Sequence, residues 1–375
     1  MDHGLLLGIR LFLFNKRRFA VAVAAVAVAA VIMFVEYGFL NGVLAAQSNI
    51  ADLMRADLVA MDRARANLHR WDTMKPGRLD QIAAIPGVAK VIPIYEALAG
   101  LRDDDDRRVR RIMVIAVPPD EIPLAIGDIR TLARSLKMPH GFLFDSLARP
   151  IFGDLAPGKS VKIDEVRQQM LGYVRIGPDL VVDGLAVMNV GDWRVRRPNA
   201  QPIMGAIRLD RGVDAARVQR AIIAQLPRDI IVMTPADLRA REDAFTMGTV
   251  PIGFVFAVGM VAGLVIGAVT CYQLLFNEVL DRLAQFATLK AMGFSDLYLC
   301  RVVIGQALFL SLTGFAVGLL LTVVAERYIA DRTMLPIHAS TTALLLIFPL
   351  TVCMCILAGL AAMRRVTATD PAELY

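Results

Sequence analysis

The chain has 375 residues, of which 56% are hydrophobic and 20% are charged, and its mean hydropathy is +0.54. It is too apolar for a soluble protein of this length and too charged to lie in a membrane throughout, so both environments are expected. The net charge of +6 does not require a nucleic-acid partner. Basic residues held on the cytoplasmic side of a membrane protein are the simpler source.

Four uncharged runs are long enough, or nearly long enough, to cross a bilayer, which takes roughly 20 helical residues. They cover Phe19 to Val35 (resuming at Tyr37 after Glu36), Ala244 to Asn277, Val302 to Ala325 and Ala339 to Met363. Gly259, Gly263 and Gly267 in the second run, and Gly314 and Gly318 in the third, recur every four residues, which predicts close helix packing.

Basic residues flank these runs in three groups. Arg10 and Lys16 to Arg18 precede the first run, Arg282, Lys290 and Arg301 lie between the second and third, and Arg364 and Arg365 follow the fourth. The positive-inside rule places all three groups in the cytoplasm, which requires four crossings with both termini inside. A cleavable signal peptide ending near Ala45 and Ala46 is the alternative for the first run, but its loss would leave only three spans.

The sequence therefore predicts an α-helical membrane protein with four transmembrane helices and a large extracytoplasmic α+β domain inserted between helices 1 and 2. The expected segments are a cytoplasmic N-terminus with helix 1 (1–44), the outer domain with stalk segments (45–245), helix 2 (246–276), a cytoplasmic helix and loop (277–300), helix 3 (301–325), a short outer loop (326–338), helix 4 (339–363) and a cytoplasmic tail (364–375). The stalk would pair residues 41–54 with a helix that starts at Pro235 and continues without a break into the second run.

The outer domain alternates helix and strand signals. The expected helices cover Leu79 to Ile85 and Val213 to Leu226, and the expected strands cover Val88 to Ile94, Ser160 to Ile163, Leu171 to Ile176, Met204 to Leu209 and Ile230 to Met233. A hairpin is expected from Glu96 to Arg102 and back through Arg108 to Val117, with Asp103 to Asp106 as its solvated tip. Two helix, turn and strand units of similar plan suggest an α+β domain in two parts.

The stretch from Asn277 to Ser295 has the pattern of one amphipathic helix. Its polar side carries Glu278, Asp281, Arg282, Gln285 and Thr288, and its apolar side carries Val279, Leu280, Leu283, Phe286 and Ala287. Gly293 is the expected helix stop, and Lys290 suits the negative end of the helix dipole. Leu289 and Met292 fall on the polar side, so they either contact a partner or pack on another part of the same chain.

No catalytic or metal-binding pattern is found. Gly153 to Ser160 matches the phosphate-loop pattern, but Arg149-Pro150 interrupts the lead-in and Val161 to Ile163 alternates like a strand where a helix should begin. The four histidines are scattered, and all four cysteines lie in or beside the apolar runs. We therefore expect neither an enzyme nor a bound cofactor or metal, and no nucleic-acid partner.

Several strings resemble the ABC-transporter permeases of the MacB/FtsX-like superfamily, and most closely their DevC group. They are Thr249 with Pro251 to Phe256, Phe286 to Phe294, Gly141 to Asp145 with Arg149-Pro150 and Phe152-Gly153, and Arg364 to Val366 with Asp370 to Glu373. Two positions depart from the pattern, because Ile151 stands where relatives carry Glu and Glu36 where they carry Gln. Neither departure lies in the stretch from Asn277 to Ser295.

The resemblance implies a permease homodimer in the bacterial inner membrane that binds a separate cytoplasmic ATPase, a periplasmic membrane-fusion adaptor and a TolC-like outer-membrane duct. ATP would be bound by the ATPase. Residues 277–295 would be the coupling helix, with Leu289 and Met292 as apolar contacts, Glu278, Asp281, Arg282 and Lys290 as rim charges and Gly293 as the stop. A lipid, glycolipid or other amphiphile is the cargo that the DevC group suggests, and an FtsX-like signalling subunit that activates a periplasmic partner without transport is the alternative.

Overall fold

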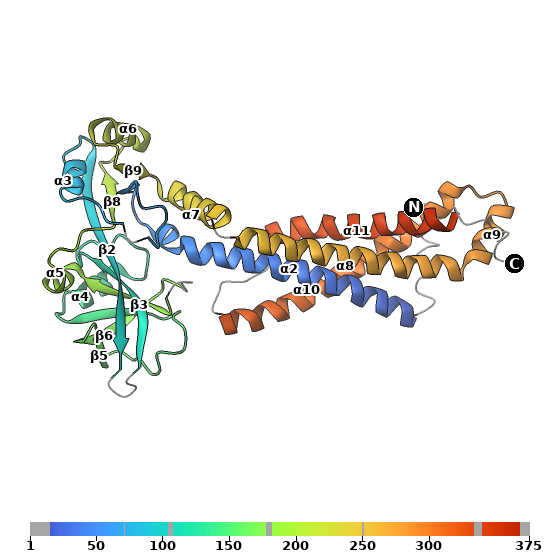
Figure 1. Cartoon of the computed structure of the whole chain (residues 1–375), viewed down its shortest axis with the longest axis horizontal. Coiled ribbons are helices and arrows are strands. Elements are labelled where there is room, and N and C mark those ends of the chain that lie inside the picture. Colours follow the sequence, from blue (N-terminus) through green and yellow to red (C-terminus); the bar gives the residue numbers. More distant parts are fainter. Residues whose placement is uncertain are drawn as a thin grey trace. The chain divides into compact units, whose positions relative to one another are not determined.

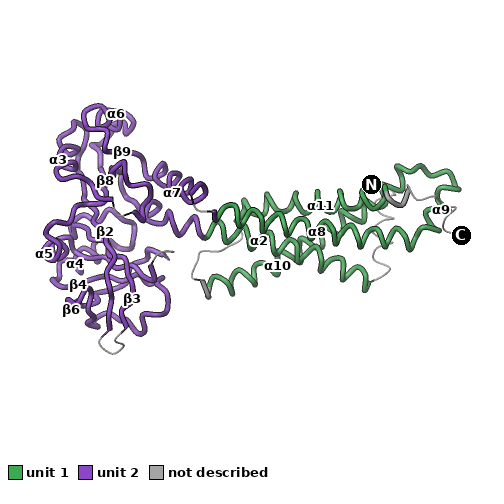
Figure 2. Tube along the Cα trace, viewed as in Figure 1, with its two compact units in different colours: residues 1–42, 252–375 green, residues 43–251 purple. Residues whose placement is uncertain are grey.

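A computed structural model describes residues 16–70, 72–103, 108–177, 182–249, 251–333 and 340–367 of the chain. The chain divides into two compact units, with residues 1–42 and 252–375 in unit 1 and residues 43–251 in unit 2, coloured green and purple in Figure 2. Three predicted features lie outside the described residues: Arg10, the Asp104 to Asp106 part of the hairpin tip, and the motif from Asp370 to Glu373.

Unit 1 is built from long apolar helices. They are α2 (Lys16–Leu53), α8 (Ile252–Asp281), α10 (Asp296–Thr333) and α11 (Thr341–Thr367), with the short α9 (Leu283–Ala291) between α8 and α10 (Figure 1). Four helices are long and apolar enough to cross a membrane in the part of the chain that the structure describes. The four predicted spans are therefore confirmed as helices of spanning length.

Glycines let these helices approach one another closely. A Cβ placed on Gly267 of α8 would lie 2.7 Å from the Ala29 Cβ of α2, and one on Gly318 of α10 would lie 3.0 Å from the Ala27 carbonyl oxygen. Such distances leave no room for a larger residue without a shift of backbone. The prediction that the glycine repeats mark close packing is confirmed, and the partner in both contacts is α2 of the same chain.

The first part of unit 2 is a four-stranded antiparallel sheet with two helices. Its elements are β1 (Leu58–Asp62), α3 (Arg78–Ala83), the first half of β2 (Val88–Arg102), β8 (Met204–Leu209), α6 (Ala215–Gln225) and β9 (Ile230–Met233). The strand order is β2-β8-β1-β9, so two βαβ units interleave as in ferredoxin-like sheets. Ile82 of α3 and Val218 and Ile222 of α6 pack in one core with Leu58 and Val232 of the sheet.

The second part of unit 2 is a closed ring of six strands. It combines the second half of β2 with β3 (Val109–Val117), β4 (Gly141–Asp145), β5 (Ser160–Ile163), β6 (Val166–Val174) and β7 (Gly184–Asn189), and α4 (Ile129–Leu136) and α5 (Val190–Arg196) belong to the same part. The ring runs β2-β3-β7-β4-β6-β5 and returns to β2, where β5 pairs only with Leu101 and Arg102. Alternate residues of β3 enter two different cores, as the two-residue period of a strand requires.

Most predicted strands are confirmed, and the predicted hairpin is present, with Arg102 opposite Val109. The separate strands Val88 to Ile94 and Glu96 to Arg102 are one continuous strand, β2. The sequence analysis missed β1, β4, β7, α4 and α5. All five residues of β1 and of β4 are buried, so neither strand shows the polar and apolar alternation by which strands are recognised.

The helix from Pro235 is not continuous with the second span, which corrects the prediction. Helix α7 (Pro235–Thr249) ends before Pro251, and α8 begins at Ile252. Proline lacks the backbone N–H and disfavours helical geometry in the residue before it, so a boundary at this point is expected physically. The predicted pairing of the stalk segments is confirmed by the ion pair between Asp52 of α2 and Arg239 of α7 at 2.5 Å.

Candidate functional site

The predicted coupling helix is two helices in the structure. Helix α8 ends at Asp281, Arg282 has a non-helical ψ of 13°, and α9 begins at Leu283. Glu278 and Arg282 form an ion pair one turn apart at this bend, and both side chains are largely buried. The bend keeps Phe286 of α9 in a core that includes Val279 of α8 and Val302 of α10. Burial of this apolar face therefore overrides the continuous helical pattern of the sequence.

The two apolar residues on the polar side have different surroundings. Leu289 is half-buried and packs against the core shared by α8, α9, α10 and α11, whereas Met292 is 62% exposed. For Leu289 the structure therefore favours the alternative in which the side chain packs on its own chain. Met292 lies at the surface, where a partner could contact it.

Gly293 stops α9 as the sequence predicts. Its φ is +91°, its N–H donates to the Lys290 carbonyl, and the Phe294 N–H donates to the Leu289 carbonyl. These two bonds are the signature of a Schellman motif, in which glycine adopts the left-handed conformation at low cost. These backbone hydrogen bonds therefore set the direction in which the chain leaves α9 after Met292.

The predicted rim charges are only partly at the surface. Asp281 pairs with Arg18 of α2, and Lys290 pairs with Asp296 at 2.9 Å, with all four side chains at least half exposed. Glu278 and Arg282, two of the predicted rim charges, are largely buried and pair with each other. They stabilise the bend between α8 and α9.

The structure adds two exposed apolar residues that the sequence analysis did not select. Phe294 is 40% exposed and Leu297 is 63% exposed, and both follow Met292 at the turn into α10. We call Met292, Phe294 and Leu297 the corner patch. The signal that could have found them is their position: Phe294 directly follows the glycine stop and Leu297 lies in the first turn of α10, so neither belongs to the helical pattern that ends at Met292.

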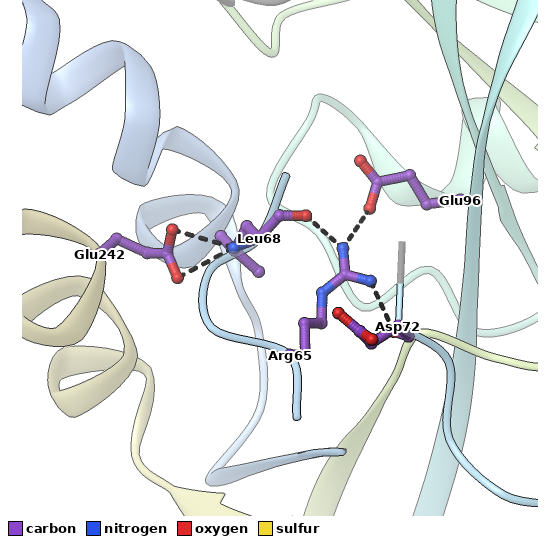
Figure 3. Close-up of polar contacts among 5 residues, drawn as sticks. All are labelled: Arg65, Leu68, Asp72, Glu96 and Glu242. Carbon is purple, nitrogen blue, oxygen red and sulfur yellow. Dashed lines mark hydrogen bonds and ion pairs between the residues drawn. The ribbon is translucent and has the colours of Figure 1, made fainter. Parts of the chain in front are cut away.

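A second site in unit 2 gathers buried charges around Arg65 (Figure 3). The Arg65 side chain is 1% exposed and donates to the carbonyl oxygens of Leu68 and Asp72 and to the Glu96 carboxylate of β2, the last at 2.9 Å. Glu242 of α7 accepts the Leu68 N–H on both carboxylate oxygens, at 3.0 and 3.1 Å. We call Arg65, Leu68, Glu96 and Glu242 the Arg65 cluster.

The Arg65 cluster joins the stalk helix α7 to the sheet through a short loop. Arg241, the neighbour of Glu242 on α7, donates to the Arg65 carbonyl at 2.9 Å. Burial raises the pKa of Glu242 to about 7, and the Leu68 N–H and the positive charges of Arg241 and Arg65 oppose this rise. The cluster was missed because Arg65, Glu96 and Glu242 are far apart in the sequence.

The phosphate-loop pattern does not have phosphate-loop geometry. Ser160 begins strand β5 where a helix would be required, as predicted, and Lys159 pairs with Asp103 at 2.5 Å. Asp145, from one of the motif strings, accepts the N–H groups of Leu147, Ile176 and Gly177, so it closes the end of β4. In the described residues no group of three or more His, Cys, Asp or Glu side chains is arranged to hold a metal ion.

Comparison with solved structures returns similar chains. The periplasmic region of MacB from Actinobacillus actinomycetemcomitans is 10% identical, with a TM-score of 0.37, over 50% of this chain and 92% of the other. The extracellular domain of the noncanonic ABC-type transporter YknZ from Gram-positive bacteria is 11% identical, with a TM-score of 0.34, over 48% of this chain and 99% of the other. No curated protein matches the chain.

A protein-family model matches residues 254–371 and is described as the FtsX-like permease C-terminal family. The matched segment includes nearly all of α8, the whole of α9, α10 and α11, and the corner patch. The C-terminal part of this chain, residues 254–371, is therefore similar in sequence to the C-terminal domain of FtsX-like permeases.

Proposed function

We propose that this chain is the permease subunit of an ATP-driven ABC exporter. The observation that carries the proposal is the match to the FtsX-like permease C-terminal family, over a segment that contains the bend between α8 and α10. ATP hydrolysis would occur in a separate cytoplasmic ATPase, and the permease would work as a homodimer. The chain itself would bind no cofactor.

The corner patch is the proposed contact with the ATPase. Met292 and Leu297 are each more than 60% exposed, and Asp281 and Lys290 lie near them in sequence. A few apolar side chains that become buried at the centre of an interface usually dominate its binding energy, with charges at the rim. Leu289 and Gly293 would act by fixing the geometry of the patch, since Leu289 is packed inside and Gly293 sets the turn.

The basic residues support a cytoplasmic position for this corner. Arg18, Arg282, Lys290, Arg301 and Arg364 all lie near the ends of α2, α8, α10 and α11 on the side of the α8 to α10 connection. Unit 2 would then lie in the periplasm, and the protein would span the bacterial inner membrane four times with both termini inside.

Unit 2 is the proposed receiver of the movement. Helix α7 precedes α8 directly in the chain and is tied to β2 through the Arg65 cluster, so a displacement of α7 would be transmitted to the sheet. The partners would be a periplasmic membrane-fusion adaptor and a TolC-like outer-membrane duct, and the cargo a lipid, glycolipid or other amphiphile, as in the DevC group.

Replacement of the corner patch tests the proposed function. The full-length chain with both Met292→Asp and Leu297→Asp should lose co-purification with the ATP-binding subunit of the same genome, because a buried carboxylate at the interface would be unpaired. Val195→Asp is the matched control, since Val195 is an 83% exposed apolar residue of unit 2. Membrane insertion should be the same in both variants.

Unchanged co-purification of the double variant would contradict the proposed contact. Transport itself is measured in proteoliposomes that contain the permease, the ATPase and the adaptor. Movement of a labelled amphiphile with ATP would support export. Activation of a periplasmic enzyme without movement of any amphiphile would contradict export and support the signalling alternative.

A further inference from the structure

A cavity of about 280 Å³ lies between the first two turns of α2 and the last turns of α8, within unit 1. Its walls are Arg18, Ala22, Leu274, Asn277, Glu278, Leu280 and Asp281. This volume is just below the roughly 300 to 1,000 Å³ of pockets that hold drug-sized ligands, so the cavity suits a smaller group.

The cavity lies at one end of the apolar parts of both helices. On α2, Ala22 is four residues beyond Arg18, and on α8, Leu274 is seven residues before Asp281. At 1.5 Å per residue, apolar walls give way to charged ones within about 6 Å on α2 and about 10 Å on α8. Basic residues precede the apolar run of α2 at this end. The cavity is therefore expected at the boundary between the hydrocarbon region of a membrane and water.

Glu278 contributes a buried carboxylate to the wall of this cavity. Its side chain is only 7% exposed, and its Oε1 atom accepts a hydrogen bond from Arg282. The second oxygen, Oε2, accepts no hydrogen bond within the described part of the chain, and it is not one of the enclosed polar atoms that lack a partner there. This oxygen can therefore be reached from the cavity. A donor brought into the cavity would offset the cost of leaving it unpaired.

The other polar walls provide both signs of charge. Arg18 and Asp281 pair with each other, and both side chains are at least half exposed. The exposed Asn277 amide makes no hydrogen bond to any described residue. With the pair of Glu278 and Arg282, the charged groups at the cavity sum to zero.

The chemistry of the walls favours a zwitterionic headgroup over other ligands. A primary ammonium group has three N–H donors, which the Glu278 carboxylate and the Asn277 amide oxygen can accept, and a phosphate suits the guanidinium of Arg18. An anionic headgroup would add a negative charge beside two carboxylates, which is unfavourable. In the described residues no group of three or more His, Cys, Asp or Glu side chains could hold a metal ion, so a bound cation is disfavoured.

We propose that this cavity binds the headgroup of a phospholipid that carries a primary ammonium group, that is, a phosphoethanolamine headgroup. The ammonium donates to Glu278 Oε2 and to the Asn277 amide oxygen, and the phosphate accepts from Arg18. An acyl chain follows Ala22 and Leu274 into the hydrocarbon region, which is why the ligand is a lipid and not the free headgroup.

A bound lipid would act on the bend between α8 and α9. Glu278 contacts the lipid through one oxygen and Arg282 through the other, and Arg282 is the residue at which the helix is interrupted. Basic pockets at the cytoplasmic ends of membrane helices are known sites of lipid recognition, and here the two carboxylates change the headgroup that is selected. The inference requires that unit 1 crosses a membrane, but it does not depend on the proposed transport function.

A series of lipids with one charge and different numbers of donors tests the proposal. The full-length protein in detergent is titrated with phosphatidylethanolamine, its N-methyl and N,N-dimethyl forms and phosphatidylcholine, all with the same acyl chains, and bound lipid is counted by native mass spectrometry. The net charge is the same throughout, while the N–H donors fall from three to none. Affinity should fall along the series, by at least tenfold from first to last.

Substitutions of the ammonium acceptors should remove this preference. Glu278→Gln keeps an acceptor for Arg282 but loses the charge, so phosphatidylethanolamine should bind about tenfold more weakly and phosphatidylcholine as before. Asn277→Ala should have the same effect to a smaller extent. Gln273→Ala is its matched control, because Gln273 is an exposed amide of α8 that does not line the cavity. Thermal unfolding shows whether Glu278→Gln is folded in the assay, and Asn277→Ala provides the test if it is not.

Substitution of Arg18 tests the phosphate contact separately. Arg18→Gln should weaken every lipid of the series about tenfold, because all of them carry the phosphate. Arg17→Gln is the matched control, since Arg17 is the adjacent exposed arginine of α2 and does not line the cavity. Equal affinities for phosphatidylethanolamine and phosphatidylcholine, or tighter binding of phosphatidylglycerol than of either, would overturn the proposal. Displacement of the lipid by an equal concentration of soluble phosphoethanolamine would overturn its assignment to a lipid.

Discussion

At the scale of the single residue, Glu242 is a buried carboxylate whose protonation should change with pH. It is 1% exposed, lies on the stalk helix α7, and accepts one backbone N–H on two oxygens. Buried carboxylates are usually paired with a cation, but the guanidinium groups of Arg65 and Arg241 donate their hydrogen bonds to backbone carbonyls and to Glu96. Glu242 therefore responds to pH within the physiological range.

The stability of unit 2 should depend on the protonation of Glu242. Burial raises the pKa of Glu242 in the folded protein to about 7, from the ordinary value of 4.5. Between these values the folded state holds a proton that the unfolded state has lost, so the free energy of unfolding falls as pH rises from about 4.5 to about 7. Glu242→Gln removes this dependence, and above pH 7 it should raise the free energy of unfolding by up to about 3 kcal/mol relative to the native chain.

Thermal unfolding of the full-length protein in detergent at pH 5 and pH 8 measures this effect. The native chain and Glu242→Gln should unfold at similar temperatures at pH 5, and the variant at the higher temperature at pH 8. Glu165→Gln is the control, because Glu165 is a mostly exposed carboxylate of the same unit that pairs with Arg102. If Glu242→Gln unfolds at a lower temperature than the native chain at pH 8, the ionised carboxylate stabilises the fold, contrary to this interpretation.

At the scale of the element, glycines of α8 and α10 lie against α2. A Cβ placed on Gly263 or Gly267 of α8, or on Gly314 or Gly318 of α10, would in each case contact atoms of α2, and at Gly314 it would lie only 2.6 Å from the Val26 Cβ. Small residues replace the hydrophobic effect as the source of helix association inside a membrane, where lipid is as apolar as the side chains.

Gly318→Ala should weaken the contact between α2 and α10. The added Cβ would lie 3.0 Å from the Ala27 carbonyl oxygen and 2.9 Å from the Ala30 Cβ, and a backbone atom cannot rotate away as a side chain can. We expect a loss of stability of about 1 to 3 kcal/mol, the usual cost of overpacking, measured as a lower unfolding temperature in detergent.

Gly248→Ala is the matched control for this substitution. Gly248 lies in α7, and a Cβ at this position meets no atom within 4 Å. Alanine is the better helix former by roughly 1 kcal/mol, so this variant should be as stable as the native chain or more stable. Equal effects of the two substitutions would show that the contact between α2 and α10 is not as close as the distances indicate.

The elements also show which features a single sequence can predict. The four long helices follow from composition, and the Gly293 stop follows from the conformational freedom of glycine, so both were predictable. The bend at Arg282 depends on burial of the Glu278 pair and of Phe286 against α10, which are contacts between segments. The same contacts bury Leu289, so the sequence could indicate its apolar character but not its partner.

Sites built from segments that are far apart in the sequence could not be predicted for the same reason. Arg65, Glu96 and Glu242 are each ordinary surface-type residues in their local sequence, and only the fold brings them together. Strand β2 likewise pairs with β8 in one half and with β5 in only two residues of the other half. Periodicity identified both halves of β2 but not their continuity.

At the scale of the whole molecule, the surfaces of the two units favour different surroundings, lipid for unit 1 and water for unit 2. Unit 1 exposes many apolar side chains on α8, α10 and α11, such as Phe254, Leu320 and Leu345, which water would disfavour and lipid would accept. Unit 2 buries its apolar residues in cores of its own and carries charges on its surface. One chain can satisfy both only if unit 2 lies wholly on one side of a membrane that unit 1 crosses.

The side of the membrane on which each unit is exposed can be measured by cysteine labelling. In a variant with Cys271, Cys300, Cys353 and Cys355 replaced by Ala, a single cysteine is introduced as Val195→Cys in unit 2 or as Met292→Cys at the corner patch. Both native side chains are more than 60% exposed, so burial does not limit the reaction. With basic residues held inside, a membrane-impermeant maleimide should label the Val195→Cys protein in intact spheroplasts and the Met292→Cys protein only after permeabilisation. Labelling of Met292→Cys in intact spheroplasts would place the corner patch outside, away from any cytoplasmic ATPase, and would contradict the orientation on which the proposed function depends.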